Sequence, residues 1–357
     1  MKILITGICG FVGSSLAKYL LESSPALEIV GIDNFSRSGS WLNKPPLNAL
    51  GIKVYHGDIR MESDLEMLPK VDWVIDAAAN PSVLAGVDGK TSSLQLVQNN
   101  LVGTINLLEF CKRNKAGFIL LSTSRVYSIP GLCNIQMTTE KERFVPAGNQ
   151  KFPQGVTING INENYSTQPP VSLYGCTKLS SEQLALEYGI TYNFPVWINR
   201  CGVMAGPGQF GHPGQGIFAY WVHSFKEKKP LQYIGFSGKG LQVRDCLHPR
   251  DMISLLLRQF NEPLTTQKPR TINIGGGLTN SMSLAQMTNW CNKYFGTNYQ
   301  VQQTDSTRPF DIPWVVLDCT KAKEVWGWEP TTKIEQVLQE IAAFAEKQDN
   351  WCEISQL

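Results

Sequence analysis

The sequence predicts an α/β fold of the Rossmann type, in which helices cover both faces of a doubly wound parallel sheet. Three observations support this. Apolar, strand-like segments alternate with helical ones, and a glycine-rich turn joins the first strand to the first helix. The chain of 357 residues is also too long to fold around one small core. We expect a Rossmann domain at 1–195, with a loop insertion at 129–168. A smaller α/β lobe at 196–357 should be discontinuous, with some strands returning to the Rossmann sheet.

Composition indicates a globular protein with no bias toward nucleic acids or membranes. Hydrophobic residues make up 42% of the chain, charged residues 17%, and the net charge is +2. No apolar run reaches the roughly 18 residues of a membrane helix, and a strand begins where a signal peptide would stand. The nine cysteines are scattered, without a Cys-x-x-Cys pair. This pattern favours reduced cysteines in a cytoplasmic protein and offers no metal site.

The first element is a buried strand at residues 2–6 that leads directly into a glycine turn and a helix. The turn, residues 7–13, has the spacing Gly-x-x-Gly-x-x-Gly. At such a junction the free amides and the positive end of the helix dipole can hold a pyrophosphate. The junction therefore predicts a dinucleotide site, although the glycines could also serve only helix–strand packing. The predicted contacts are Gly7, Gly10, Phe11, Val12 and Gly13.

The second strand, residues 28–32, ends at Asp33, 20 residues after Gly13. An acidic residue at this place hydrogen-bonds the adenosine ribose hydroxyls. Its charge disfavours the 2′-phosphate of NADP, so the sequence favours NAD, although Arg37 nearby keeps that preference open. We assign Asp33, Asn34 and Arg37 to the cofactor site.

The next two strands, residues 52–55 and 73–75, should end at the same edge of the sheet. Asp58 follows the first of them and is either an acceptor for the adenine amino group or a turn aspartate. Alanines follow the second, and small side chains there let the backbone approach a cofactor. The assigned cofactor contacts are Asp58, Ile59, Ala77, Ala78 and Ala79.

Strands and helices continue to alternate along the rest of the chain. We expect helices at 94–114, 252–260, 284–295 and 334–345, and strands at 118–121, 196–199, 231–236 and 271–274. Phe218, Trp221 and Phe225 form an aromatic stripe at helical spacing, which indicates core. The segment Trp326-Gly327-Trp328 is typical of a packing corner.

The predicted chemistry centres on Tyr174 and Lys178, which are four residues apart on one helix face. An ammonium group favours the phenolate, so we expect Lys178 to lower the pKa of Tyr174 and make it an acid/base for a hydroxyl. Thr123 ends a central strand on the ligand side of the sheet and can bind the same hydroxyl. Taken alone, the pair could be an ordinary exposed helix face and Thr123 a loop cap.

Together the glycine turn, Thr123 and Tyr174-x-x-x-Lys178 resemble the extended short-chain dehydrogenase/reductase family, over nearly the whole chain. The resemblance implies tightly bound NAD and a nucleoside-diphosphate sugar as substrate. Arg244 and Arg308 match the arginines that hold the diphosphate of that sugar. Arginine suits this role because its planar guanidinium pairs two phosphate oxygens. Taken alone, each of the two could instead form a surface salt bridge. The implied cofactor contacts add Asn100, Tyr174 and Lys178, and the implied substrate contacts are Asn80, Ser124, Arg125, Arg200, Gln209, Arg244, Arg308 and Asp311.

Within that family the chain looks most like NAD-dependent epimerases that invert C2 of a CDP-linked hexose, on segments 174–178, 242–248 and 251–255. Ser124 and Arg125 stand where 4,6-dehydratases have an Asp-Glu pair, so a carboxylate pair for elimination is missing. The resemblance implies a transient keto-sugar and an internal hydride return that regenerates NAD+. The alternatives are a UDP-sugar 4-epimerase, a less favoured 4,6-dehydratase, and a non-catalytic NAD-binding regulator.

The resemblance also implies a homodimer through the helices near 94–114 and 172–188, and a role in making deoxysugars of surface polysaccharides. Ala205 and Leu173 replace a tyrosine and a proline that are usual in the family. The Gly-, Pro- and Asn-rich loop at 129–168 is longer than the family leads us to expect, which suggests a lid or an interface element. These departures leave the catalytic residues intact and the identity of the sugar open.

Overall fold

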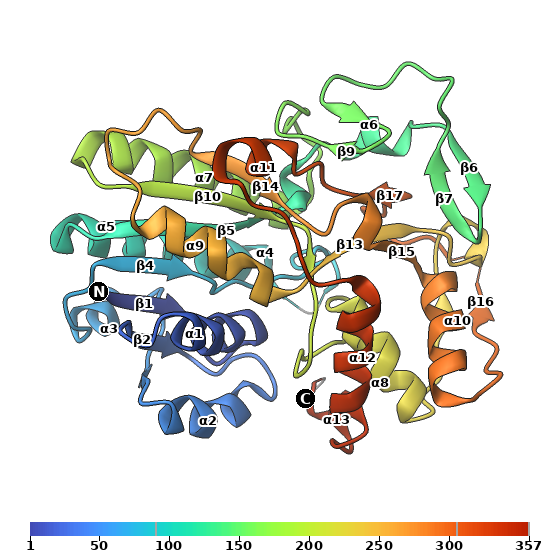
Figure 1. Ribbon diagram of the computed structural model, residues 1–357, viewed down its shortest axis with the longest axis horizontal. Coiled ribbons are helices and arrows are strands. Elements are labelled where there is room, and N and C mark those ends of the chain that lie inside the picture. Colours follow the sequence, from blue (N-terminus) through green and yellow to red (C-terminus); the bar gives the residue numbers. More distant parts are fainter. Residues whose placement is uncertain (90, 305, 356–357) are drawn as a thin grey trace.

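The centre of the molecule is a seven-stranded parallel sheet (Figure 1). The computed structural model describes residues 1–89, 91–304 and 306–355. Along the sheet the strands follow the order β14-β10-β5-β4-β1-β2-β3. Their bounds are β1 Lys2–Thr6, β2 Glu28–Asp33, β3 Lys53–His56, β4 Trp73–Asp76, β5 Gly117–Thr123, β10 Val196–Cys201 and β14 Thr271–Ile274.

The order of the strands confirms the predicted doubly wound fold. From β1 the chain moves outward through β2 to β3, then returns to β4 on the other side of β1 and continues to β14. The direction of winding therefore reverses between β1 and β4. In sheets of this type a ligand crevice opens at that reversal, outside the carboxyl ends of the strands.

Two layers of helices enclose the sheet, because its strands are apolar on both faces. Ile3 and Ile5 of β1 belong to one buried cluster, whereas Leu4 between them belongs to another on the opposite face. The first face is covered by α1 (Phe11–Ser23), α2 (Lys44–Ala49), α9 (Ile253–Phe260) and α11 (Thr320–Trp326). The second is covered by α3 (Glu62–Glu66), α5 (Gly103–Asn114) and α7 (Ser172–Tyr192), and α4 (Ser93–Val97) packs against α7.

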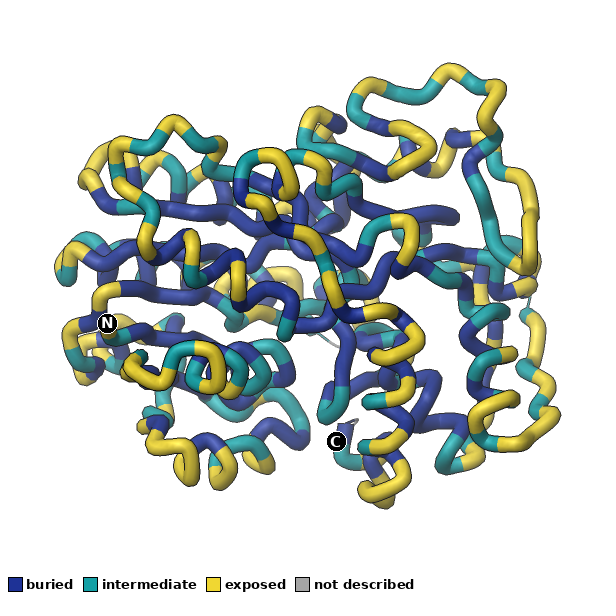
Figure 2. The backbone as a smooth tube through the Cα atoms, in the orientation of Figure 1, coloured by how far each residue is buried: buried dark blue, intermediate teal, exposed yellow. Residues whose placement is uncertain are grey.

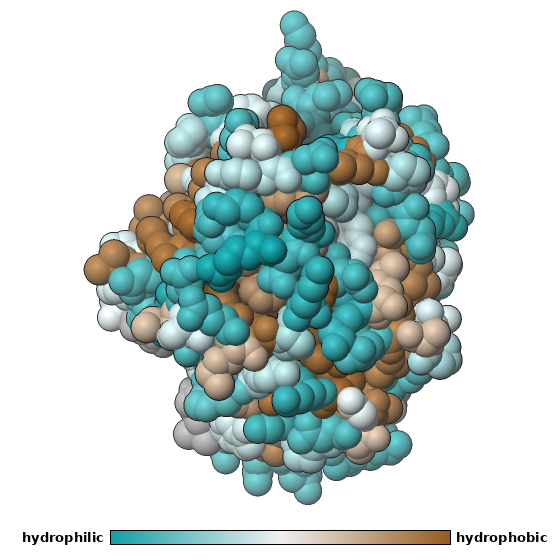
Figure 3. All heavy atoms as spheres, turned by 90° about the vertical axis from the view of Figure 1, so that its left-hand side faces the viewer, coloured by the Kyte–Doolittle hydropathy of each residue, from teal (hydrophilic) through white to brown (hydrophobic). Residues whose placement is uncertain are grey.

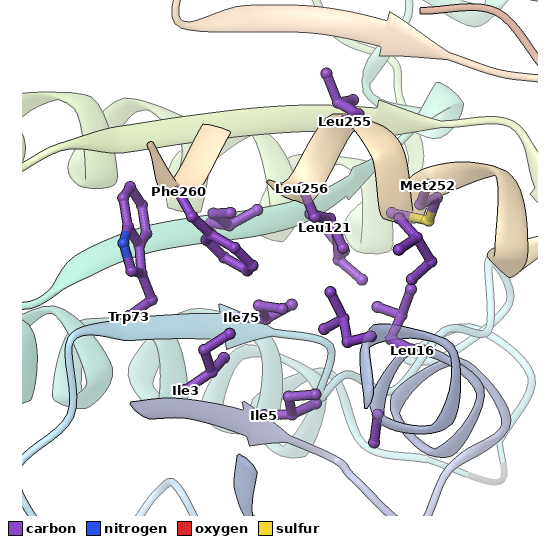
Figure 4. Packing of buried hydrophobic residues seen from close by; sticks show 14 of the residues in the cluster. Ile3, Ile5, Leu16, Trp73, Ile75, Leu121, Met252, Leu255, Leu256 and Phe260 are labelled. Carbon is purple, nitrogen blue, oxygen red and sulfur yellow. The ribbon is translucent and has the colours of Figure 1, made fainter. Parts of the chain in front are cut away.

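The packing between the sheet and the first helical layer is closely interdigitated. Figure 4 shows Ile3, Ile5 and Ile75 of the strands facing Leu16 of α1 and Leu256 of α9 across the core. In Figure 2 the strands form the buried interior, and exposed residues gather on helices and loops around them. Trp326 and Trp328 are buried in the same cluster, as predicted for a packing corner.

A smaller lobe lies beside the carboxyl ends of the large sheet (Figure 1). Its core contains Phe218, Trp221 and Phe225, as the aromatic stripe predicted. Its strands are β11 Val203–Met204, β12 Gln232–Tyr233, β13 Val243–Leu247, β15 Ser281–Ser283, β16 Gln302–Gln303 and β17 Trp314–Val315. Its helices are α8 Ile217–Lys226, α10 Leu284–Phe295, α12 Ile334–Ala345 and α13 Trp351–Ile354.

Three local expectations from the sequence are corrected. The helix expected at 94–114 contains a π-helical turn, Gln98–Val102, between α4 and α5. The strand expected at 231–236 is limited to β12, because Gly235, Phe236 and Ser237 all have positive φ angles that end an extended strand. Residues 129–168 are not a structureless loop.

That insertion contains α6 (Ile129–Cys133) and two hairpins, β6–β7 (Met137–Glu140 and Arg143–Pro146) and β8–β9 (Val156–Thr157 and Gly160–Ile161). Its apolar side chains share a buried cluster with β17 and the residues around it. Elements this short carry too little periodicity to be recognised from sequence. Among the described residues, no helix is long and apolar enough to cross a membrane.

Candidate active site

A cavity of about 830 Å³ opens where the strand order reverses, between the large sheet and the smaller lobe. The structure brings nearly all of the predicted site residues to its walls, from strand ends that lie far apart in sequence. Two predicted residues, Asn100 and Arg200, are not among those walls. The predicted residues that line the cavity are Gly7, Gly10, Phe11, Val12, Gly13, Asp33, Asn34, Arg37, Asp58, Ile59, Ala77, Ala78, Ala79, Asn80, Thr123, Ser124, Arg125, Tyr174, Lys178, Gln209, Arg244, Arg308 and Asp311.

The glycine turn at one end of the cavity has no room for larger residues. Gly7 has φ of +58°, and a Cβ at Gly13 would lie 2.4 Å from the Gly7 carbonyl oxygen. Helix α1 starts after Gly10 without any side-chain cap, so its first amides face the cavity. This arrangement fits the pyrophosphate of a dinucleotide, which needs close backbone approach and hydrogen-bond donors at a helix N-terminus.

Asp33 and Asp58 lie at the same end, at the carboxyl ends of β2 and β3. The Asp33 carboxylate accepts hydrogen bonds of 2.8 Å from the backbone amides of Cys9 and Phe35, and burial raises its pKa. Burial opposes ionisation of Asp58 as well, but hydrogen bonds from Arg60 and Asn34 outweigh it and lower that pKa to about 2. Both carboxylates therefore face the cavity on well-ordered turns, which suits an adenosine site.

Asn100 holds the site together from outside the cavity. It is buried on the π-helical turn, where its side chain accepts from the Asn80 amide at 2.8 Å and donates to the Asn80 carbonyl at 3.0 Å. It also donates to Thr177 Oγ1 at 3.3 Å. A direct cofactor contact of Asn100 stays a prediction. Asn100 fixes the loop after β4 against α7.

Tyr174 and Thr123 meet because α7 packs directly on the segment that follows β5. A Cβ at Gly175 would lie 2.2 Å from the Arg125 carbonyl oxygen, so only glycine allows this approach. The first turn of α7 is fixed by Ser172, whose hydroxyl accepts from the Gly175 amide at 3.1 Å. The Thr123 hydroxyl accepts from the Arg125 amide at 3.1 Å and lies near enough to the Tyr174 phenol to lower its pKa in part.

The expected effect of Lys178 on Tyr174 is not what the structure gives. Burial raises the pKa of Tyr174 to about 12, and only Thr123 and Arg125 lower it in part. Burial also lowers the pKa of Lys178, whose charge interacts mainly with Asp76. Sharing a helix face is therefore not enough for Lys178 to set the pKa of the phenol, because burial of both groups outweighs it. The cation that acts on the phenol is Arg125.

Arg200, predicted to contact substrate, takes part in a buried ion pair outside the cavity lining. Its Nη2 lies 2.6 Å from Glu182 Oε2, with side chains 7% and 0% exposed respectively. Its Nη1 donates to the Tyr127 hydroxyl at 3.4 Å, and Glu182 also accepts from Ser122. The guanidinium is thus committed to a buried pair that ties β10 to α7, and it does not reach the cavity.

A second group of charges lines the opposite end of the cavity. Arg244 pairs with Asp311 at 3.0 Å and donates to the Ile312 carbonyl at 2.8 Å. Arg308 donates to the Gly214 carbonyl at 3.3 Å. Arg125 donates to the Phe310 carbonyl at 3.1 Å, and burial lowers the pKa of Arg125 to about 9. Three guanidinium groups against one carboxylate make this end positive, which suits a diphosphate.

Several cavity residues were not found from the sequence. Gln242 lines the cavity, with its Nε2 donating to the Ile234 carbonyl at 2.7 Å. It stands two residues before Arg244, and the two-residue period of a strand puts both on one side, so its position was a usable signal. The loop at 209–216, in which only Gln209 was predicted to contact substrate, also forms a wall. Within the described residues, no three His, Cys, Asp or Glu side chains are grouped to hold a metal ion.

The fold and this cavity are those of a dinucleotide-dependent enzyme whose second lobe brings arginines to the cavity. Residues 3–275 match the family described as "NAD dependent epimerase/dehydratase family", and the chain belongs to this family. NAD is accordingly its cofactor, as predicted. The enzyme class inferred from the sequence, an NAD-dependent nucleotide-sugar epimerase, is confirmed by relatives of that kind.

Individual relatives cover almost the whole chain. CDP-paratose 2-epimerase from Salmonella typhi is 30% identical, over 96% of this chain and 98% of the relative, which confirms the resemblance drawn from the sequence. UDP-glucuronic acid 4-epimerase from Bacillus cereus, solved with UDP-glucuronic acid and NAD, is similar with a TM-score of 0.76 and 28% identity, covering 97% of this chain and 99% of that one. dTDP-glucose 4,6-dehydratase from Bacillus anthracis, solved with NAD, has a TM-score of 0.75 and 25% identity, with both chains fully covered.

The geometry of the glycine turn predicts that Gly13→Ala abolishes tight NAD binding. The added methyl group must displace the Gly7 carbonyl or the Ile8 backbone, which lie 2.4 and 2.7 Å from its position, so the turn loses its fit to a pyrophosphate. NAD content after purification and NAD affinity by calorimetry measure this. Gly148→Ala, where the Cβ meets open space, is the control. Unchanged NAD affinity in Gly13→Ala would contradict the assignment.

The buried pair predicts a stability effect for Arg200 rather than a substrate effect. Arg200→Ala leaves the Glu182 carboxylate buried and uncompensated, which should cost about 3–5 kcal/mol of unfolding free energy. Arg113→Ala, which removes an exposed pair with Glu62, should cost less than about 1 kcal/mol. Urea unfolding measures both. A variant with unchanged stability and a raised KM for substrate would show that Arg200 binds substrate after all.

Proposed function

We propose that this enzyme is an epimerase that inverts C2 of a CDP-linked hexose, of the CDP-paratose or CDP-tyvelose type. The reaction passes through a transient keto-sugar and returns the hydride internally. Support comes from the 30% identical CDP-paratose 2-epimerase and from the residues that follow Thr123. The alternative is a UDP-sugar 4-epimerase, and the similarity to the structure of UDP-glucuronic acid 4-epimerase supports it.

Each catalytic group has a separate task in this proposal. The Tyr174 phenol oxygen takes the proton of the sugar hydroxyl and later returns it, while Thr123 Oγ1 holds that oxygen in reach. Lys178 is buried at the cavity wall and is positioned to contact the nicotinamide ribose. Bound NAD+ supplies the hydride acceptor and is regenerated, so no external redox partner is needed. The cofactor is held by the glycine turn, by Asp33, Asn34, Arg37, Asp58 and Ile59, and by the alanines after β4.

The observation that favours an epimerase over a dehydratase is the lack of a free carboxylate beside Tyr174. Among the described cavity residues the carboxylates are Asp33 and Asp58 at the adenosine end and Asp311, which pairs with Arg244. A 4,6-dehydratase needs an acid and a base next to the reacting sugar. Ser124 and Arg125 supply neither carboxylate, so an oxidation–reduction cycle without elimination fits better. An NAD-binding regulator would need none of Thr123, Tyr174 and Lys178, which weighs against that reading.

We also propose that the enzyme is a cytoplasmic homodimer that uses α5 and α7. Exposed apolar side chains lie on or beside these helices, with Ile190 79% and Leu94 65% exposed. Figure 3 shows that the end of the molecule at the left of Figure 1 is mainly hydrophilic, with smaller hydrophobic areas between the polar ones. A dimer through these helices would bury Ile190 and Leu94.

One proton NMR panel tests the reaction. Purified protein is mixed with CDP- and UDP-hexoses in deuterated water without added NAD. The proposal predicts inversion at C2 of a CDP-hexose without deuterium uptake, because the hydride never exchanges with solvent. Tyr174→Phe keeps the aromatic core and removes the acid/base, and should reduce kcat at least about 100-fold.

The other outcomes identify the alternatives. Inversion at C4 of a UDP-hexose would replace the proposed reaction with that of a 4-epimerase. Deuterium incorporated at C5 would indicate dehydration. Turnover that is unchanged in Tyr174→Phe would contradict the assigned acid/base.

A further inference from the structure

Arg125 occupies a special place, between the catalytic tyrosine and the phosphate-binding arginines. Its backbone amide donates to Thr123 Oγ1 at 3.1 Å, and its carbonyl packs against Gly175, next to Tyr174. Its guanidinium reaches the opposite side, where Nη1 donates to the Phe310 carbonyl at 3.1 Å. One residue therefore connects the reacting end of the cavity to the segment that carries Arg308 and Asp311.

The Arg125 guanidinium is available to a ligand. The bond to Phe310 uses one of its five N–H donors, and the side chain lines the cavity. Arg244, by contrast, already spends donors on Asp311, Ile312 and the Val243 carbonyl. Asp311 offsets one of the three arginine charges, so the end as a whole keeps an excess of two positive charges. A doubly negative diphosphate matches that excess.

The chemistry of a hexose decides where that diphosphate must lie. C2 is bonded directly to the anomeric carbon, which carries the β-phosphate through one oxygen. C4 lies across the ring from it. An enzyme that presents C2 to Tyr174 must therefore accept the β-phosphate close to Tyr174 and Thr123, whereas an enzyme that presents C4 holds the phosphate farther away. A cation on the same segment as Thr123 is needed only in the first case, because a phosphate held there without a cation is costly.

We propose that Arg125 is a specificity-determining residue that binds the β-phosphate of the nucleotide sugar and thereby places C2, rather than C4, at Tyr174. This inference rests on the proposed function. Arg244 and Arg308 then hold the rest of the diphosphate from the smaller lobe. The same cation also favours the Tyr174 phenolate, so Arg125 links recognition of the phosphate to the acid/base that acts on the neighbouring carbon.

Binding of nucleotides without the sugar tests the phosphate contact independently of turnover. CDP has a β-phosphate and CMP does not. Arg125→Gln should weaken CDP binding roughly 10- to 100-fold, as expected for a lost charge-assisted hydrogen bond, and leave CMP binding unchanged. Arg125→Lys should retain part of the preference for CDP. Lys323→Gln, at an exposed ion pair with Glu329 on helix α11, is the control, and thermal unfolding verifies that each variant is folded.

Two results would overturn the contact. An equal loss for CDP and CMP would mean that Arg125 supports the nucleoside or the scaffold. No loss for either nucleotide would mean that Arg125 does not bind the phosphate. UDP and UMP are measured in parallel in case the enzyme prefers uridine. Weak binding of both cytidine nucleotides to the wild-type protein is then not mistaken for evidence against Arg125.

Product analysis then tests the selection of carbon. Arg125→Gln should lower kcat for C2 inversion more than it raises KM, and move the acid limb of the kcat/KM profile to higher pH. The sign follows because removing a positive charge raises the pKa of the Tyr174 phenol, which must be deprotonated to act as base. A purely structural role would not move that limb. C4 inversion by the wild-type protein would refute the proposed function, and unchanged C2 turnover in Arg125→Gln would refute the selection role alone.

Discussion

The contact between the first turn of α7 and the chain that leaves β5 is the constraint on which the active site depends. Because position 175 is glycine, the helix comes close enough for its backbone to touch the Arg125 carbonyl. That approach sets Tyr174 against Thr123 and turns the Arg125 side chain toward the smaller lobe. The proposed acid/base Tyr174, Thr123 and the backbone of Arg125 are therefore held together by a single packing contact. Catalysis benefits because such groups need no reorganisation during the reaction.

Buried polar groups beneath that contact keep it rigid. Glu182 and Arg200 join α7 to β10, while Asn100 joins the π-helical turn to the loop after β4 and to α7. These side chains are satisfied by one another and not by a ligand. A network of this kind is costly if one member is missing. These polar side chains are therefore committed to one another, and they support the cavity without lining it.

Much of this arrangement could be predicted from the sequence, and the exceptions have physical causes. The strand–glycine–helix junction, Asp33 and the ends of β4 and β5 depend on local spacing, so their positions at one sheet edge followed from the fold. Arg200 also stands near a strand end, but its partner Glu182 is on α7. The pair forms only when the helix packs on the sheet, so no spacing in the sequence indicates it. Lys178 shares a face with Tyr174, yet burial and Asp76 decide where its charge acts. The hairpins of the insertion are too short to show a period.

The central claim is that a hydride leaves C2 of the sugar and returns to the same carbon from the other face. A CDP-hexose carrying deuterium at C2, incubated in ordinary water, tests it most directly. The account predicts a C2-inverted product that keeps the label at C2, because the cofactor holds the deuterium between the two transfers. Inversion at C2 with the label replaced by hydrogen from water, or inversion at C4 with C2 left in its original configuration, would contradict it.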